Sequence, residues 1–158
     1  MMGHGMGTKA IGAVMGGTLS LHGALERSGL KPEQVDEVIM GCVLPSGLRQ
    51  GPARQAAIDA GIPVSVGATT INKLCGSGMK AAMLAFDQIK AGTNNIMVAG
   101  GMESMSNAPY LLPKVRTGLR MGHGELQDAM FTDGLEDAKT GRLMGAFAQD
   151  VADQFQVT

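Results

Sequence analysis

The residue in this sequence best placed for covalent chemistry is Cys75, which lies in the segment 72–81 (NKLCGSGMKA). A β-branched run precedes the cysteine and a helical pattern follows it, so we expect the thiol at a junction between a strand and a helix. Unpaired N–H groups and the positive end of the helix dipole favour a thiolate there. A thiolate attacks acyl carbonyls readily, and the N–H groups around Gly76 and Gly78 are candidate donors to the resulting oxyanion. The segment therefore predicts a nucleophilic cysteine, although a lone free cysteine is more often a small buried hydrophobe.

The same glycines fit a second interpretation. Residues 76–81 (GSGMKA) have the spacing G-x-G-x-x-A of a dinucleotide-binding turn, which also joins a strand to a helix. That turn requires an acidic residue about 20 positions further along the chain. Glu103 is the candidate, but for a carboxylate after an apolar strand we favour a hydrogen-bonded structural role.

Strands and helices alternate around these residues. Apolar residues recur at helical spacing over 9–25, 76–91 and 142–155, and residues 52–61 open with a proline and close with a glycine, as helices do. Short apolar runs at 38–44, 68–72 and 95–101 predict strands. The alternation predicts the α/β class with a parallel sheet. Beyond residue 102 we expect a loop-rich excursion. Five methionines are expected to pack against the sheet and a subunit interface: Met79, Met83, Met97, Met102 and Met105.

Composition argues against several classes of protein. The 158 residues include 13 Lys and Arg against 14 Asp and Glu, and 3% are aromatic, so a nucleic-acid partner is not expected. No apolar run approaches the ~18 residues that a membrane span needs, and the first residues lack a signal-peptide pattern, which predicts a cytoplasmic protein with no membrane partner. Two cysteines and three scattered histidines show no zinc-site spacing, so no metal is expected.

Several ordered motifs resemble the amino-terminal region of the thiolases. Besides residues 72–81, they are residues 41–45 (GCVLP), 52–57 (PARQAA), 99–106 (AGGMESMS), 109–113 (PYLLP) and 120–122 (RMG). The resemblance runs from about residue 25 to the end and is closest to the acetyl-CoA C-acetyltransferases. Because ordered motifs are more specific than one G-x-G, we prefer this interpretation to dinucleotide binding.

The resemblance implies a reaction and roles for particular residues. Cys75 would take an acetyl group while its own N–H holds the thioester oxygen, and a second acetyl-CoA would attack it to give acetoacetyl-CoA and coenzyme A, reversibly. Coenzyme A is then part of the substrate, and no cofactor is implied. Leu135 and Met144 resemble substrate-binding positions, with core packing as the alternative. Cys42 is expected to be a buried small residue that does not pair with Cys75. The family also implies a homo-oligomer, a dimer or a tetramer.

The expected fold is a thiolase-like amino-terminal domain, with a parallel or mixed sheet and covering helices, truncated at both ends. Residues 1–7 are expected to be a disordered or artificial start, 8–113 the amino-terminal core without its first strand, and 114–158 the start of the loop domain. The family's Gly-His-Pro and Cys-x-Gly-Gly-Gly segments, which supply its activating histidine and deprotonating cysteine, do not occur in the 158 residues. The chain alone is therefore expected to be inactive. A degradative 3-ketoacyl-CoA thiolase fragment and an inactive truncation that acts as an oligomerisation partner remain the alternatives.

Overall fold

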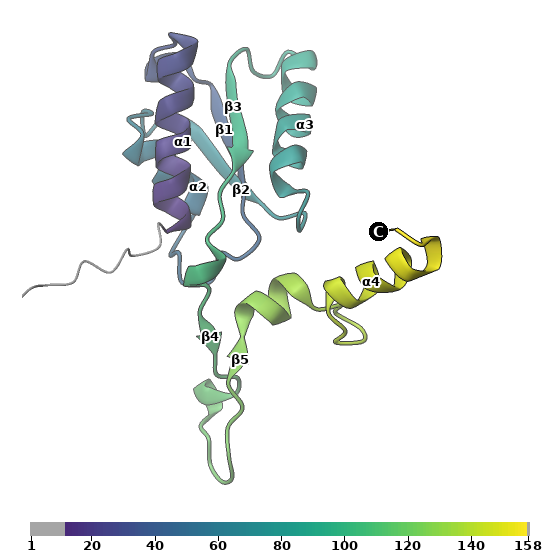
Figure 1. The fold of residues 1–158 in the computed structure, drawn as a ribbon. Coiled ribbons are helices and arrows are strands. Elements are labelled where there is room, and N and C mark those ends of the chain that lie inside the picture. The colour runs from purple at the N-terminus through teal and green to yellow at the C-terminus, as the bar shows by residue number, and fades with distance from the viewer. Residues whose placement is uncertain (1–11, 158) are drawn as a thin grey trace, which may run out of the picture.

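Three parallel strands form the centre of the layered part of the molecule (Figure 1). The computed structural model describes residues 12–157. Strands β1 (Glu37–Gly41), β2 (Gly67–Ile71) and β3 (Met97–Gly101) lie in the order β2-β1-β3. In this register Gly41 pairs with Ile71 on one side and with Gly101 on the other. The carboxyl ends of all three strands therefore meet at one edge, where the loops that follow them converge.

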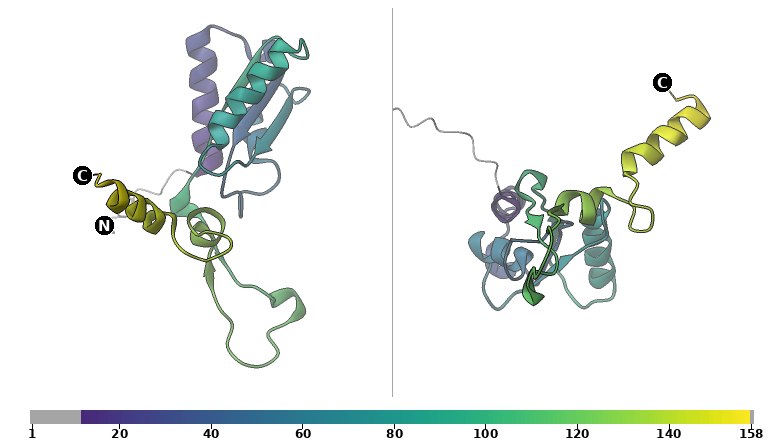
Figure 2. Two further views of the ribbon diagram at one scale, coloured as in Figure 1. Left: turned by 90° about the vertical axis from the view of Figure 1, so that its right-hand side faces the viewer. Right: turned by 90° about the horizontal axis from the view of Figure 1, so that it is seen from below.

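Helices cover both faces of the sheet (Figures 1 and 2). Helices α1 (Ala13–Ser28) and α2 (Pro52–Asp59) lie on one face, and α3 (Ser77–Lys90) lies on the other. Side chains alternate along β1, so Val38 joins the core under α1 and α2 whereas its neighbour Ile39 faces α3. The predicted α/β class with a parallel sheet is confirmed. The main core cluster consists of Leu21, Leu25, Val35, Val38, Met40, Cys42, Ala53, Ala56, Ala57, Ala60, Ile62 and Met102.

The observed bounds of the elements differ from the predicted ones by a few residues. Strand β1 stops before the predicted end at residue 44, because the N–H groups of Val43 and Leu44 bind a side chain and not a neighbouring strand. Helix α1 runs past residue 25 and ends at Gly29, whose φ of 69° is the left-handed conformation that closes many helices. The expected start at residues 1–7 lies outside the described residues.

After β3 the chain leaves the layers and forms a hairpin and then a separate helix (Figures 1 and 2). Strand β4 (Tyr110–Leu111) pairs antiparallel with β5 (Gln127–Asp128), and the π-helical turn η4 (Phe131–Leu135) follows. Helix α4 (Met144–Phe155) buries none of its residues. A loop-rich stretch was predicted here, but two-residue strands are too short for an alternating pattern to reveal them. The domain boundary after residue 113 stays a prediction. Within residues 12–157 the structure also has three short 3-10 turns: η1 (Pro32–Gln34), η2 (Met105–Asn107) and η3 (Val115–Thr117).

The methionines do not all pack as predicted. Met102 is buried in the core, as expected, but Met79 and Met83 are 72% and 52% exposed. Both lie on the face of α3 that points away from the sheet, together with the exposed Phe86. Packing against the sheet is therefore the wrong expectation for these two residues, and the subunit interface stays a prediction.

Across residues 12–157, every helix is too short or too polar to span a bilayer.

Candidate active site

A tight turn between β2 and α3 presents Cys75 at the carboxyl edge of the sheet. Leu74, directly before the cysteine, has a φ of 48°, a left-handed conformation that is strained for a residue with a branched side chain. Ser77, the first residue of α3, is 4% exposed and holds the turn. Its Oγ accepts the N–H of Lys73 at 2.8 Å and donates to the carbonyl of Leu74 at 2.6 Å. Cys75 is exposed, and its predicted place between a strand and a helix is confirmed.

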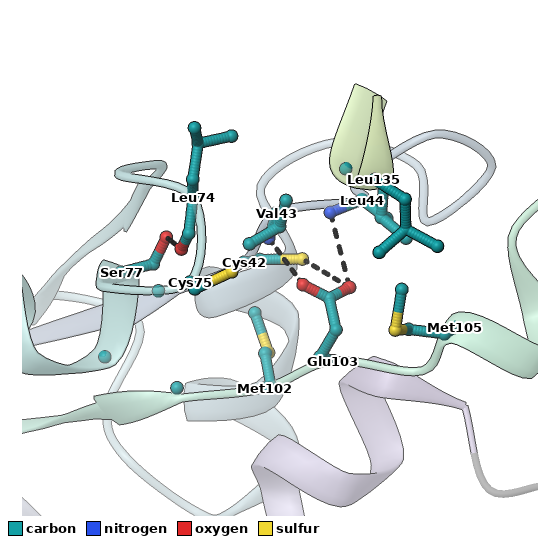
Figure 3. A pocket seen from close by; sticks show the side chains of 14 residues that line it. Cys42, Val43, Leu44, Leu74, Cys75, Ser77, Met102, Glu103, Met105 and Leu135 are labelled. Atoms are coloured by element: carbon teal, nitrogen blue, oxygen red, sulfur yellow. Dashed lines mark hydrogen bonds between the residues drawn. The ribbon is translucent and has the colours of Figure 1, made fainter. Parts of the chain in front are cut away.

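The Cys75 side chain lies in a pocket of about 400 Å³ (Figure 3). The walls come from the segments that follow the three strands and from η4, and they are mostly apolar with one carboxylate, that of Glu103. A concave, apolar site with few polar groups is typical of small-molecule binding. The lining consists of Gly41, Cys42, Val43, Leu44, Leu74, Cys75, Ser77, Gly78, Gly101, Met102, Glu103, Met105, Gly134 and Leu135.

The floor of the pocket depends on a close backbone contact at Gly41. A Cβ at this position would lie 2.5 Å from the carbonyl carbon of Ser77 and 2.6 Å from the nitrogen of Gly78. These backbone atoms cannot rotate away, so only glycine lets the end of β1 touch the first turn of α3. From the sequence alone, Gly76 and Gly78 are the positions expected to permit close approach of a neighbouring strand or of the substrate. At Gly78, however, the nearest atom to an added Cβ is 3.6 Å away, which is ordinary contact.

Not every amide near Cys75 is available to an oxyanion. The N–H of Gly76 donates to the carbonyl of Lys73 at 3.1 Å, and the N–H of Ser77 donates to that of Leu74 at 2.9 Å. The expectation that the Gly76 amide donates to the oxyanion is therefore wrong for this conformation. The role of the Cys75 amide stays a prediction.

The second cysteine of the pocket is buried, and its ionisation to a thiolate is suppressed. Cys42 is 1% exposed, and its Sγ donates to Oε1 of Glu103 at 4.0 Å. Burial raises the pKa of the Cys42 thiol to about 11, and the negative charge of Glu103 adds to this shift. The thiolate, the reactive form, is therefore scarce near neutral pH. The prediction of a buried small residue is confirmed, and both cysteines are free.

Glu103 is a structural acceptor, as predicted. It follows β3 and reaches across to the chain beyond β1, where Oε2 accepts the N–H of Val43 at 2.6 Å and Oε1 accepts the N–H of Leu44 at 3.3 Å. Figure 3 shows these bonds beside the thiol of Cys42. The sequence identifies Glu103 but not its partners, because a linear pattern does not reveal which amides a carboxylate reaches across a sheet.

The structure brings together two of the three predicted site residues. Leu135, from η4, lines the same pocket as Cys75, whereas Met144 begins α4, is 45% exposed and is not part of the lining. The roles assigned to all three stay predictions. In the stretch from residue 12 to residue 157, no cluster of three or more His, Cys, Asp or Glu side chains is arranged to hold a metal ion.

Comparisons with known proteins point to one family. Residues 5–158 match the family model described as thiolase, N-terminal domain. The acetyl-CoA acetyltransferase of Cupriavidus necator is 55% identical over 142 residues, which cover 90% of this chain and 36% of that protein. Acetyl-CoA acetyltransferase 2 of Arabidopsis thaliana is 51% identical over 142 residues, covering 90% of this chain and 35% of that protein.

A solved structure shows the same fold. The Acat5 thiolase from Ascaris suum, crystallised in complex with coenzyme A, matches with a TM-score of 0.88 and 38% sequence identity. The match covers 94% of this chain and 38% of the other. This chain thus spans little more than a third of the length of the proteins it resembles.

Proposed function

Because the chain belongs to the thiolase family, through that family's amino-terminal domain, we propose that it is part of an acetyl-CoA C-acetyltransferase with Cys75 as the acyl-accepting nucleophile. In the first half-reaction the Cys75 thiolate attacks the thioester carbonyl of acetyl-CoA, the acetyl group passes to sulfur, and coenzyme A leaves as its thiolate. In the second, an acetyl-CoA that has lost a methyl proton attacks the acetyl-cysteine through carbon. Acetoacetyl-CoA forms, and the Cys75 thiolate is restored.

One observation carries this proposal: an exposed cysteine at the turn before α3 opens onto an apolar pocket of about 400 Å³. An acetyl group is small and uncharged, so an apolar wall suits it. Leu135 lines that wall, which supports its proposed substrate-binding role. The role proposed for Met144 depends on the family resemblance alone.

The substrate class follows from the relatives. Their names, acetyl-CoA acetyltransferase, favour acetyl-CoA and acetoacetyl-CoA over the longer 3-ketoacyl-CoA of a degradative thiolase. The related solved structure holds coenzyme A, which supports its role here as part of the substrate. No separate cofactor is proposed.

The assembly and the compartment are also part of the proposal. Apolar side chains stand exposed on α3 and along the hairpin, for example Phe86, Leu119 and Met121, and surfaces of this kind favour a homo-oligomer. Two free cysteines fit a reducing compartment such as the cytoplasm. Sedimentation of the whole protein distinguishes a monomer from a dimer or tetramer.

The exchange of labelled coenzyme A into acetyl-CoA tests the proposed function, because it requires only the first half-reaction. We expect the whole protein to exchange the label above the uncatalysed rate, and we expect Cys75→Ser to abolish this exchange. The matched preparation is the whole wild-type protein alkylated at Cys75, which should also be inactive. If exchange persists in both preparations, a residue other than Cys75 must accept the acetyl group.

A further inference from the structure

A chain of hydrogen bonds connects Glu103 to the turn that carries Cys75. It begins at the carboxylate, whose Oε2 accepts the N–H of Val43 at 2.6 Å. An ionised acceptor makes a shorter and stronger hydrogen bond than a neutral one. The residue after β1 is therefore held by a charge that comes from the end of β3.

Asn72 extends the connection from Val43 to the turn. Its Nδ2 donates to the carbonyl of Val43 at 3.1 Å, and its Oδ1 accepts the N–H of Leu74 at 2.8 Å. Val43 is thus bound on both sides, by Glu103 at its N–H and by Asn72 at its carbonyl. The path runs from Glu103 through Val43 and Asn72 to Leu74, and Cys75 is the next residue along the chain.

The last residue of this path is the strained one. Leu74 has a φ of 48°, and its two backbone polar groups are both engaged, the N–H by Asn72 and the carbonyl by Ser77. A left-handed conformation in a branched residue persists only where its surroundings hold it. Ser77 ties the turn to α3, and Asn72 ties it to the end of β1.

We propose that Glu103 and Asn72 are positioning residues for Cys75. They hold Leu74 in its left-handed conformation and so direct the cysteine side chain into the pocket. Neither residue is assigned a proton transfer or a contact with the reacting atoms. The importance of this positioning for acyl transfer rests on the proposed function, whereas the hold on the turn does not.

The test compares two pairs of variants. Glu103→Gln removes the negative charge from the acceptor of the Val43 N–H and so weakens the path, whereas Asn72→Ala breaks it. Asp36→Asn and Asn94→Ala are matched controls at the opposite end of the sheet, where Asp36 accepts the N–H groups of Asn95 and Ile96 and Asn94 donates to Glu37 and Gln88. Asp36→Asn weakens a carboxylate acceptor as Glu103→Gln does, and Asn94→Ala removes amide bonds as Asn72→Ala does, without touching the Cys75 turn.

The first measurement is amide hydrogen exchange at Leu74, followed by NMR, with the melting temperature of every variant recorded alongside. Glu103→Gln should speed exchange at Leu74 by about threefold or more, the effect expected for a weakened hydrogen-bond path, although Glu103 does not contact Leu74. The double variant should exceed Asn72→Ala only slightly, because both changes cut one path. The controls should leave Leu74 unchanged even where they lower the melting temperature equally. Unchanged exchange at Leu74 in Glu103→Gln overturns the inference.

A second measurement separates the inference from the proposed function. In the whole protein, acetyl-CoA should label the wild-type Cys75. Labelling should be about threefold or more slower in both path variants and should keep the wild-type rate in both controls. If Leu74 exchange is coupled to Glu103 but acetyl-CoA never labels Cys75, the proposed function fails while the hold on the turn stands. If labelling is equal in all five chains, positioning of the nucleophile is refuted. If Glu103→Gln does not fold, Asn72→Ala provides the test instead. Hydrogen exchange of the Val43 N–H, which donates to Glu103, should then become faster, because coupling along the path acts in both directions. Unchanged exchange at Val43 would overturn the inference.

Discussion

The two cysteines of the pocket should differ greatly in their reactivity toward iodoacetamide. Cys75 is exposed, whereas Cys42 is 1% exposed and its pKa is raised from 9.0 to about 11. At pH 8 a thiol of pKa 9.0 is about 9% thiolate and one of pKa 11 about 0.1%, a ratio of about 90. The pKa shift alone should therefore make Cys42 react about 100-fold more slowly in the folded chain than in the same chain unfolded in urea. Burial of the side chain also excludes the reagent and should slow the reaction further.

The assay is timed alkylation at pH 8 followed by trypsin digestion and mass spectrometry. Cleavage after Lys73 and Lys80 isolates Cys75 in residues 74–80, and cleavage after Arg27 and Arg49 isolates Cys42 in residues 28–49. Cys75 should be labelled in the folded chain while the Cys42 peptide stays unmodified. Alkylation of Cys42 at the same rate in the folded and the unfolded chain would refute the argument from burial and charge.

Three further predictions follow from the packing, the pKa shift and the sequence. Gly41→Ala should lower the free energy of unfolding by about 2 kcal/mol in urea titrations, because the added Cβ meets backbone atoms. The control Gly145→Ala, in the exposed helix α4, should be neutral or stabilising. Equal effects of the two substitutions would contradict the close contact at Gly41. The folded-state pKa of Cys42 lies above its unfolded value, so its contribution to stability is complete below pH 9 and is lost as the pH rises toward 11. The free energy of unfolding should therefore fall by about 2 kcal/mol between pH 8 and 10.5. Cys42→Ser should show a smaller fall over the same pH range. The 158-residue chain alone should form no acetoacetyl-CoA in a spectrophotometric assay, because it has neither a Gly-His-Pro nor a Cys-x-Gly-Gly-Gly segment; sustained turnover would contradict this.

Local patterns in the sequence predict the parts of this fold that depend on neighbours along the chain. Short apolar runs between turn residues give the three strands, and helical spacing gives α1 and α3, so the junction that carries Cys75 can be placed in advance. The burial of Cys42 follows in the same way, because it continues an apolar strand and has no charged neighbour in sequence.

Features that depend on contacts across the sheet escape such analysis. Glycine is needed at position 41 because the backbone of α3 lies against it, and the partners of Glu103 lie in the segment that follows β1. Periodicity also fails to show which apolar face of a helix is covered. Met79 and Met83 fit a helical stripe, but the structure places them on the outward face of α3.

Acetylation of Cys75 by acetyl-CoA tests the central claim most directly. The whole protein is incubated with acetyl-CoA, digested and mapped by mass spectrometry under conditions that preserve thioesters. We predict one acetyl group on residues 74–80, none on residues 28–49, and its removal when free coenzyme A is added. A peptide 74–80 that stays unacetylated, in a whole protein whose Cys75 still reacts with iodoacetamide, would contradict the assignment of Cys75 as the acyl-accepting nucleophile.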